Sequence, residues 1–459
     1  MSYPRTVQGV ARPPATLLLQ TVSVLCGRQA TLADLQHRSH WVSATGGYTQ
    51  STRHAVDMLE FHLAYAFTHA PHVNHGAVVH AVQPGLQTMP FFAPAARAMM
   101  HRWEHPHLTA FDGCLQAESV TNTLRQHLFP QGLFLSASSL ETYARCPFRY
   151  FLETVLALKP WEEPEQILTL LPRDRGVLVH AILYEFFSRL QQTDQLPLSA
   201  QRNNDERRLL TQIAEEHFAV FAQTRPVGLP LLWELEREHL LRRLHAFLQR
   251  ERQTAHDFCP AAFETFFGIG TKGIESEVRE SERTSNPQFL TPNTPVPFRL
   301  DTGEEVQLRG RIDRIDVSTE HVDLVQPRQA RILDYKTGRT PARGFVGGTA
   351  LQLALYLYAA QHLRPDLDWV GAEYTSVDGT AQPDKKPLTV ETQAETLGTL
   401  RTIITRLAEG ITAGLFFPAP DACQSCAFPE ICSTHGAEWA TQKLQDPHTK
   451  AWRWVRSQA

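Results

Sequence analysis

Apolar and polar residues alternate along two short stretches in the second half of the chain, residues 310–316 and 332–338. An alternation with a period of two predicts β-strands, because successive side chains of a strand point to opposite faces of the sheet. In the second stretch Asp334 and Lys336 therefore share a face. The two stretches are predicted to be adjacent strands, which deliver the carboxylates of Asp313 and Asp334 and the ammonium of Lys336 to a single point.

The residues around these stretches follow longer, mostly helical patterns. Helical periods dominate residues 136–260, whereas residues 274–338 are rich in strand patterns, with proline-containing turns at 287–297. A chain with this order is expected to form a mixed sheet flanked by helices, an α/β fold with a helical insertion. Within it we expect a first helix with Ser138 as its N-cap, a helix around His180, charged helices at 203–222 and 230–256, a helix around Gln352, a strand near Trp369–Val377 and a last helix at about 390–414.

Residues 1 to about 130 form a separate zone, rich in histidine, alanine and proline. Helical patterns are present there at Thr52–His69 and Pro94–Trp103, so an N-terminal helical region is expected. The apolar stretch 17–25 contains a glutamine and is expected to be a core strand or helix. The zone has no GxxxxGK[ST] loop to cradle nucleotide phosphates, so it cannot be an NTPase motor by itself.

Length and charge limit the classes of protein to which this chain can belong. A chain of 459 residues is long enough for two or three domains with a buried core. None of its apolar runs approaches the ~18 residues that a membrane span needs, so no membrane partner is expected. The net charge is −4, so any nucleic-acid contact must come from a local basic patch. Such a patch surrounds the two strands, and its clustering favours phosphate contacts over solvated strand edges: Arg309, Arg311, Arg314, Arg328, Arg331, Lys336, Arg339 and Arg343.

Two carboxylates and a lysine at one point suit a metal-dependent phosphodiesterase. Carboxylate oxygens hold Mg²⁺ or Mn²⁺, the cation polarises the phosphoryl group and its bound water, and the lysine orients that water or stabilises developing charge. The alternative is a solvated ion pair at the end of a strand, because an acid and a lysine two residues apart on a strand are common. The D-x-K spacing of Asp334 and Lys336 does not by itself decide between the two.

Three further motifs accompany the strand pair. The sequence Gly-Val-Leu-Val-His180 lies in an apolar helical pattern, Glu264 lies in Ala-Phe-Glu-Thr-Phe-Phe-Gly, and Gln352 and Tyr356 share one helical face. Taken singly, His180 reads as a hydrogen-bonded core residue and Glu264 as a surface glutamate. Together with the D-x-K strand, the motifs resemble the nuclease domain of the PD-(D/E)XK superfamily, in particular the RecB and AddB type of DNA-repair nuclease, over residues 136–435. The resemblance implies a restriction-endonuclease-like fold.

The resemblance also implies roles for single residues in metal binding, catalysis and DNA binding. In the reaction of this superfamily, water attacks the phosphorus in line with the leaving 3′ oxygen, and the cation stabilises the extra negative charge. The implied ligands of Mg²⁺ or Mn²⁺ are His180, Asp313, Asp334 and the carbonyl of Tyr335, with Glu264 as an additional acidic residue; Lys336 would position the water, Gln352 and Tyr356 would orient the scissile strand, and Arg311, Arg314 and Arg339 would contact DNA.

Four of the seven cysteines have positions that predict a shared group. Cys423, Cys426 and Cys432 lie close together near the C-terminus, and Cys146 lies far upstream in a Cys-Pro-Phe motif. Four thiolates can hold a four-iron, four-sulfur cluster or a zinc ion, and the spacing alone does not choose between them. The triad and the upstream motif resemble those of AddB-type nucleases, which implies a 4Fe–4S cluster. Such a cluster would close a very long loop and lock the chain's ends around the active site.

We therefore predict an N-terminal region at 1–130, a nuclease domain at 131–440 that is closed by the cluster, and a C-terminal tail at 441–459. The segment Leu108–Leu115 weakly resembles the one that joins helicase and nuclease in fused repair enzymes. The N-terminal region is accordingly either a helicase remnant or an unrelated small helical domain. Cysteines in a metal-binding pattern, in a chain with no signal peptide, indicate a reducing, cytoplasmic location.

The predicted function is that of a metal-dependent DNA nuclease, which cleaves single-stranded or unwound ends during double-strand-break repair. A separate helicase subunit is the expected partner. One alternative is a catalytically idle iron–sulfur protein that binds DNA ends for a partner helicase. A second alternative is a different metalloenzyme that uses the cysteines for zinc or redox chemistry. The direction of cleavage does not follow from the sequence.

Overall fold

The computed structural model of the chain divides into two compact units, residues 1–104 and 105–459. The second unit therefore begins well before residue 131, where the nuclease domain was predicted to start. The structure describes residues 6–7, 10–11, 16–37, 94, 97–98, 101–103, 105–128, 133–159, 167–254, 257–268, 294–318, 328–338, 344–378, 388–389, 393–420, 423, 426–432 and 436–458.

The described part of the first unit is small and mostly helical. Strands β1 (Thr6–Val7) and β2 (Val10–Ala11) pair in antiparallel fashion, and helices α1 (Thr16–Cys26) and α2 (Leu32–His37) follow them. Helix α1 contains the stretch 17–25 that was predicted to be a strand or a helix. The helix predicted at Thr52–His69 lies outside the described residues. Among the described residues, no helix is both long and apolar enough to cross a membrane.

A five-stranded mixed sheet forms the centre of the second unit, with the strand order β10-β9-β8-β7-β4. Strands β4, β7 and β8 are antiparallel neighbours, β8 and β9 are parallel, and β9 and β10 are antiparallel. Both predicted strands are present and adjacent, which confirms the strand pair around Asp313 and Asp334. The strands span Phe258–Phe267 (β4), Gly310–Ser318 (β7), Gln329–Lys336 (β8), Asp368–Ser376 (β9) and Leu388–Thr389 (β10).

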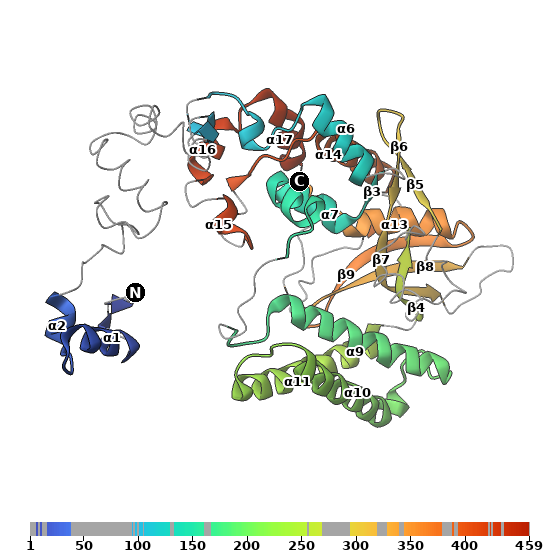
Figure 1. Ribbon diagram of the computed structural model, residues 1–459. Helices are drawn as coiled ribbons and strands as arrows, with labels where there is room; N and C mark the ends of the chain where they lie inside the picture. The colour runs from blue at the N-terminus through green and yellow to red at the C-terminus, as the bar shows by residue number, and fades with distance from the viewer. Residues whose placement is uncertain are drawn as a thin grey trace. The chain divides into compact units, whose positions relative to one another are not determined.

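Helices cover both faces of this sheet (Figure 1). Three long helices pack on one face, where Phe263 and Tyr335 join their apolar side chains in one buried cluster. On the other face, Ile315 and Ile332 pack with the next helix and with the last long one. This arrangement confirms the predicted α/β fold with a helical insertion. The helices are α9 (Pro172–Gln192), α10 (Asn203–Thr224) and α11 (Pro230–Thr254) on the first face, and α13 (Gln352–Leu363) with α14 (Gln393–Thr412) on the second.

Helix α7 (Ala137–Arg145) brings the segment before the sheet into the same core. Ser136 is its N-cap and accepts a hydrogen bond from the backbone N–H of Ser139 at 3.2 Å, so the prediction of Ser138 as the cap was wrong by two residues. A cap must accept from the N–H groups of the first turn, and the chain enters the helix one position before Ala137. Helix α8 (Pro147–Tyr150) follows directly, with Cys146 between the two helices.

The C-terminal segment packs into the core, although it was predicted to be a tail. In helix α17 (Lys450–Arg456), the buried Trp452 donates a hydrogen bond from Nε1 to the carbonyl of Ala144 at 3.0 Å. Lys443 of helix α16 (Gly436–Lys443) forms a buried ion pair of 2.9 Å with Asp112. Residues 105–115 and the C-terminus therefore belong to one folded unit with the sheet, since each buries charge or apolar area against the other.

The remaining elements are short and join these parts. A second sheet of three strands has the order β3-β6-β5, with β3 parallel to β6 and β5 antiparallel to it. The elements are η2 (Ala110–Asp112), α6 (Glu118–Leu128), β3 (Phe134–Leu135), η3 (Phe151–Val155), η5 (Ala200–Arg202), β5 (Val296–Arg299), β6 (Glu305–Leu308), α15 (Pro429–Cys432) and η8 (Pro447–Thr449).

Candidate functional site

Three neighbouring strands bring three acidic residues into a row. The pairs that flank Glu264 on β4 place it opposite Asp313 of β7. The pair of Arg314 on β7 with Leu333 on β8 is followed, one residue along each strand, by Asp313 and Asp334. All three carboxylates are buried. Because carboxylates repel one another when water is excluded, this row needs a positive charge to be stable.

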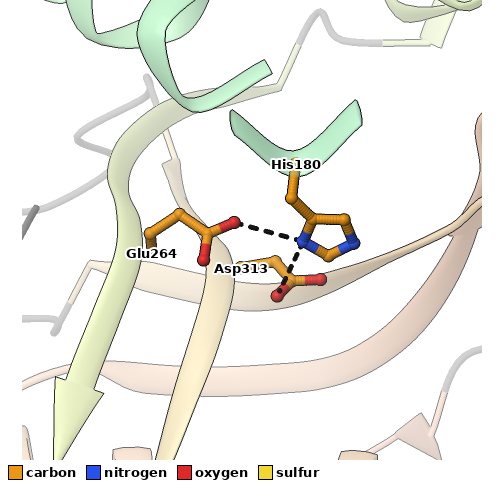
Figure 2. A group of neighbouring side chains, drawn as sticks. All are labelled: His180, Glu264 and Asp313. Carbon is orange, nitrogen blue, oxygen red and sulfur yellow. Dashed lines mark hydrogen bonds and ion pairs between the residues drawn. The ribbon is translucent and has the colours of Figure 1, made fainter. Parts of the chain in front are cut away.

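Helix α9 supplies an imidazole to the same point (Figure 2). His180 Nδ1 lies 3.2 Å from Glu264 Oε1 and 3.5 Å from Asp313 Oδ1. Its Nε2 lies 3.3 Å from the carbonyl oxygen of Tyr335. The ligand atoms of His180, Glu264 and Asp313 all lie within 4.8 Å of one another, which is the spacing of side chains that can share a metal ion.

The backbone at Glu264 is in an uncommon conformation. Its φ is +44°, in the left-handed region that non-glycine residues rarely adopt, at a cost of roughly 1–3 kcal/mol. Its Oε2 is buried and makes no hydrogen bond, although Arg311 Nε lies 2.8 Å away as an ion pair. A strained residue with an unsatisfied carboxylate oxygen is more typical of a functional site than of a surface glutamate.

The lysine of the D-x-K strand lies beside this group and is held from two sides. Lys336 Nζ forms an ion pair with Asp334, as the shared strand face predicted. It also donates a hydrogen bond of 2.9 Å to Oε1 of Gln352, the first residue of α13. Asp334 Oδ2 is buried and makes no hydrogen bond despite the ion pair. Tyr356, one turn further along α13, is buried on the same side and bonds to the Gln352 side chain.

The charges of the site shift one another's protonation. Burial disfavours a charged imidazole, but the carboxylates of Asp313 and Glu264 more than offset this and raise the pKa of His180 to about 10. Burial and the negative charge of Asp313 raise the pKa of Asp334 to about 7, against the opposing effect of Lys336. Burial alone would raise the pKa of Asp313 too, yet the neighbouring His180 and Lys336 hold it below its ordinary value.

The structure adds two residues that the sequence did not single out. Glu141 on α7 accepts a hydrogen bond at Oε1 from the backbone N–H of Leu351, at 2.8 Å. Burial raises its pKa, and the N–H groups of Leu351 and Gln352 and the charge of Lys336 oppose this rise. Tyr374 of β9 places its ring 5.1 Å from Lys336 Nζ. Nothing in the spacing of the sequence links either residue to the lysine, because both contacts depend on tertiary packing.

Comparison with known proteins identifies this constellation. A family model described as the PD-(D/E)XK nuclease superfamily matches residues 134–433, well over half of the chain. The chain belongs to this superfamily. The match extends from the strand before α7 to the residue after Cys432, so it includes every described residue of the site.

Relatives of the chain are named as a subunit, of type B, of an ATP-dependent helicase/deoxyribonuclease. The protein of that name from Natranaerobius thermophilus is 27% identical over 290 residues, which are 62% of this chain and 22% of the relative. The one from Moorella thermoacetica is 30% identical over 265 residues, 56% of this chain and 20% of the relative. The chain thus matches about a fifth of the length of these relatives. The predicted superfamily and its AddB type are confirmed.

Arg314 does not have the place that its predicted DNA contact requires. Its side chain is fully buried, with ion pairs to Asp316 and Glu251, and its guanidinium lies 4.8 Å from the centre of the Phe187 ring. A residue without solvent access cannot reach a phosphate, so this prediction was wrong. The alternation of β7 explains the error, because Asp313 and Arg314 point to opposite faces and only the first faces the site.

The other two arginines predicted to bind DNA differ in what the structure says of them. Arg311 is partly exposed at the site, where it pairs with Glu264 and lies 5.6 Å from the centre of the Phe266 ring. Its predicted DNA contact stays a prediction. Arg339 lies outside the described residues.

The cysteines predicted to share a cluster come from segments that lie side by side. The buried Cys146 accepts a hydrogen bond at Sγ from the backbone N–H of Ala419 at 3.4 Å. Cys426 Sγ accepts one from the N–H of Phe428 at 3.4 Å. Burial raises the pKa of Cys146, and the charge of Cys426 adds to this rise. The upstream cysteine therefore lies within electrostatic range of the C-terminal triad, of which Cys423 is exposed and Cys432 partly buried.

Proposed function

We propose that the second unit of this chain is a metal-dependent deoxyribonuclease that hydrolyses phosphodiester bonds. The observation that carries this proposal is the gathering of His180, Glu264 and Asp313 within 4.8 Å, next to the Asp334–Lys336 pair. Membership of a nuclease superfamily gives the reaction class. A scaffold protein gains nothing from burying these carboxylates together, since their repulsion destabilises the fold.

The residues of the site fit Mg²⁺ or Mn²⁺. Hard divalent cations prefer carboxylate and carbonyl oxygens, and Asp313, Asp334 and the Tyr335 carbonyl offer these, with His180 as a nitrogen donor. Glu264 Oε2 and Asp334 Oδ2 are buried oxygens without hydrogen bonds, which a cation would satisfy. When bound, the cation supplies Lewis acidity at the phosphoryl group and lowers the pKa of water.

The chain's own residues would then position the reacting groups. Lys336 lies next to the carboxylates and has an ammonium with free donor capacity beyond Gln352, so it can orient the attacking water. Gln352 fixes that ammonium from the side of α13. Tyr356, on the same face of α13, is placed to help orient the scissile strand. Exclusion of water by the surrounding apolar core strengthens each of these interactions.

A 4Fe–4S cluster held by Cys146, Cys423, Cys426 and Cys432 completes the proposal. Around one tetrahedral zinc ion, four sulfurs lie about 3.8 Å apart. Among the described residues, no cysteine belongs to a group of three ligand atoms within 4.8 Å of one another, so the thiols are spaced more widely than around zinc. This spacing and the backbone N–H groups that reach Cys146 and Cys426 support the larger cluster.

The names of the relatives support a role on DNA ends. Those proteins are named as parts of an enzyme that combines helicase and deoxyribonuclease activity. We infer that this chain cleaves single-stranded or unwound DNA during double-strand-break repair, together with a helicase subunit. The alternative of a catalytically idle end-binding protein is less favoured, because His180, Asp313, Asp334 and Lys336 are all present and adjacent.

One experiment tests the activity, the metal and the cluster together. The chain is purified anaerobically, its iron and sulfide are measured, and end-labelled single- and double-stranded DNA are offered with and without Mg²⁺. We expect cleavage that requires Mg²⁺, is lost with chelator and is absent in Asp313→Ala. A protein that binds DNA ends tightly but cleaves nothing under any divalent cation would instead support the idle end-binding role.

A further inference from the structure

The start of helix α13 lacks a cap of its own. Its N-cap residue is Leu351, whose apolar side chain forms no capping hydrogen bond. The first N–H groups of a helix have no partner within the helix, and leaving them unpaired in a buried position is costly. Glu141 meets this need from another element: its Oε1, on α7, accepts the Leu351 N–H at 2.8 Å.

This contact lies one residue from the group that holds the lysine. Gln352 follows Leu351 directly, and its Oε1 accepts a hydrogen bond of 2.9 Å from Lys336 Nζ. Any shift of the first turn of α13 therefore moves the Gln352 amide and changes where the ammonium lies. The connection runs from Glu141 to Leu351, to Gln352 and to Lys336 without a gap.

We propose that Glu141 is a positioning residue of the nuclease, which fixes the first turn of α13 so that Gln352 holds Lys336 in place. The proposal rests on the proposed nuclease function. It assigns Glu141 a hydrogen-bonding role, in which its acceptor oxygen matters more than its negative charge. Lys336 already has the carboxylate of Asp334 as its ion-pair partner, so it does not need a second one.

Two substitutions separate the acceptor from the charge. Glu141→Ala removes both, whereas Glu141→Gln keeps a carbonyl oxygen that accepts the Leu351 N–H. We expect Glu141→Ala to lower kcat by about 10- to 100-fold with KM unchanged, since small misplacements of catalytic groups have effects of this size. Glu141→Gln should stay within about threefold of the wild type. An equal loss in both variants would overturn the proposal, because the charge would then be what matters.

A double-mutant cycle with Gln352 tests the route of the effect. If Glu141 acts through Gln352, Glu141→Ala should lower kcat strongly in the wild type and little in a Gln352→Ala background. Full additivity would contradict the proposal. Glu153→Ala is the matched control, since this helical glutamate lies in the same region but pairs with Arg149 at 2.7 Å. It should leave kcat and KM unchanged.

Hydrogen exchange gives a reading that does not depend on cleavage. In Glu141→Ala, the amides of residues 351–355 should exchange faster than in the wild type, while those of the sheet strands stay protected. Glu141→Gln should restore the protection. If the wild type does not cleave DNA, the nuclease proposal fails, and this exchange pattern still decides the positioning role: unchanged exchange at the start of α13 in Glu141→Ala would refute it.

Discussion

The site's residues are held together by a balance of charges that a metal would change. Glu264, Asp313 and Asp334 are buried side by side, and the positive groups nearest to them are His180, Arg311 and Lys336. Without a cation, a proton on His180 offsets part of the repulsion, which agrees with the raised pKa of this imidazole. Metal binding requires that nitrogen to be unprotonated, so the cation takes the place of the proton.

Loss of either member of the D-x-K pair should abolish cleavage while the fold remains. Asp334→Ala removes a candidate metal ligand and Lys336→Ala removes the group that positions water. Each ~1.4 kcal/mol of lost transition-state stabilisation lowers the rate tenfold, so losses of about 100-fold or more are expected. End-labelled DNA cleavage and a gel-shift assay measure rate and binding separately. Asp366→Ala, in an ion pair between Arg364 and Asp366, is the control and should cleave normally. Near-wild-type cleavage by either site variant would refute the assignment.

Arg314 has a structural role that can be measured by unfolding. Its guanidinium is buried between Asp316 and Glu251, and Arg314→Leu would leave both carboxylates without their partner. Removal of one partner from a buried ion pair typically costs about 3–5 kcal/mol. We expect a loss of this size in denaturant unfolding, whereas Arg364→Ala, in a partly exposed pair, should cost at most about 1 kcal/mol. A loss of DNA affinity without a loss of stability would contradict this role.

At the level of strands and helices, the pattern of residues predicted much of what the structure contains. The alternation around Asp334 gave the strand pair and the shared face with Lys336, because period-two patterning depends only on neighbouring residues. It could not decide which face of β7 points to the site, so Arg314 was misplaced. Glu141 was missed for a related reason: its partner Leu351 is distant in the sequence, and such a contact leaves no local signal.

Helix α7 connects the proposed cluster with the proposed site. Cys146 directly follows this helix, and its N–H donates a hydrogen bond to the carbonyl of Thr142 at 2.9 Å. The helix also carries Glu141, whose partner Leu351 begins the catalytic helix α13. Movement of the cysteine end of α7 should therefore disturb the lysine as well as the fold.

Substitution of a cluster cysteine should lower stability, DNA binding and cleavage together. Cys146→Ser and Cys426→Ser each remove one proposed ligand, and the unpaired segments at both ends of the unit would loosen. We expect loss of iron, a lower unfolding temperature and weaker DNA binding, measured on anaerobically purified protein. Cys259→Ser, on β4 outside the ligand pattern, is the control and should keep its iron. Full iron content and stability in Cys146→Ser would mean that the triad uses a different fourth ligand.

At the level of the whole molecule, the comparisons account for the second unit and leave the first unaccounted for. The family match begins at residue 134, and residues 1–104 form a unit of their own. Whether that unit is a helicase remnant stays a prediction, since much of it lies outside the described residues. The relatives are several times longer than the matched region, so the ATP-dependent activity in their name cannot be assigned to this chain from the match alone.

The isolated chain should cleave DNA without any response to ATP. Its sequence has no GxxxxGK[ST] loop, and without that loop no backbone N–H groups are arranged to hold nucleotide phosphates. We expect no DNA-stimulated ATP hydrolysis and equal cleavage of single-stranded DNA with and without ATP. Blunt duplex should be digested slowly by the chain alone and faster when a separate helicase opens the ends, because the proposed substrate is an unwound strand. ATP hydrolysis by the pure protein that increases with added DNA would contradict this division of labour.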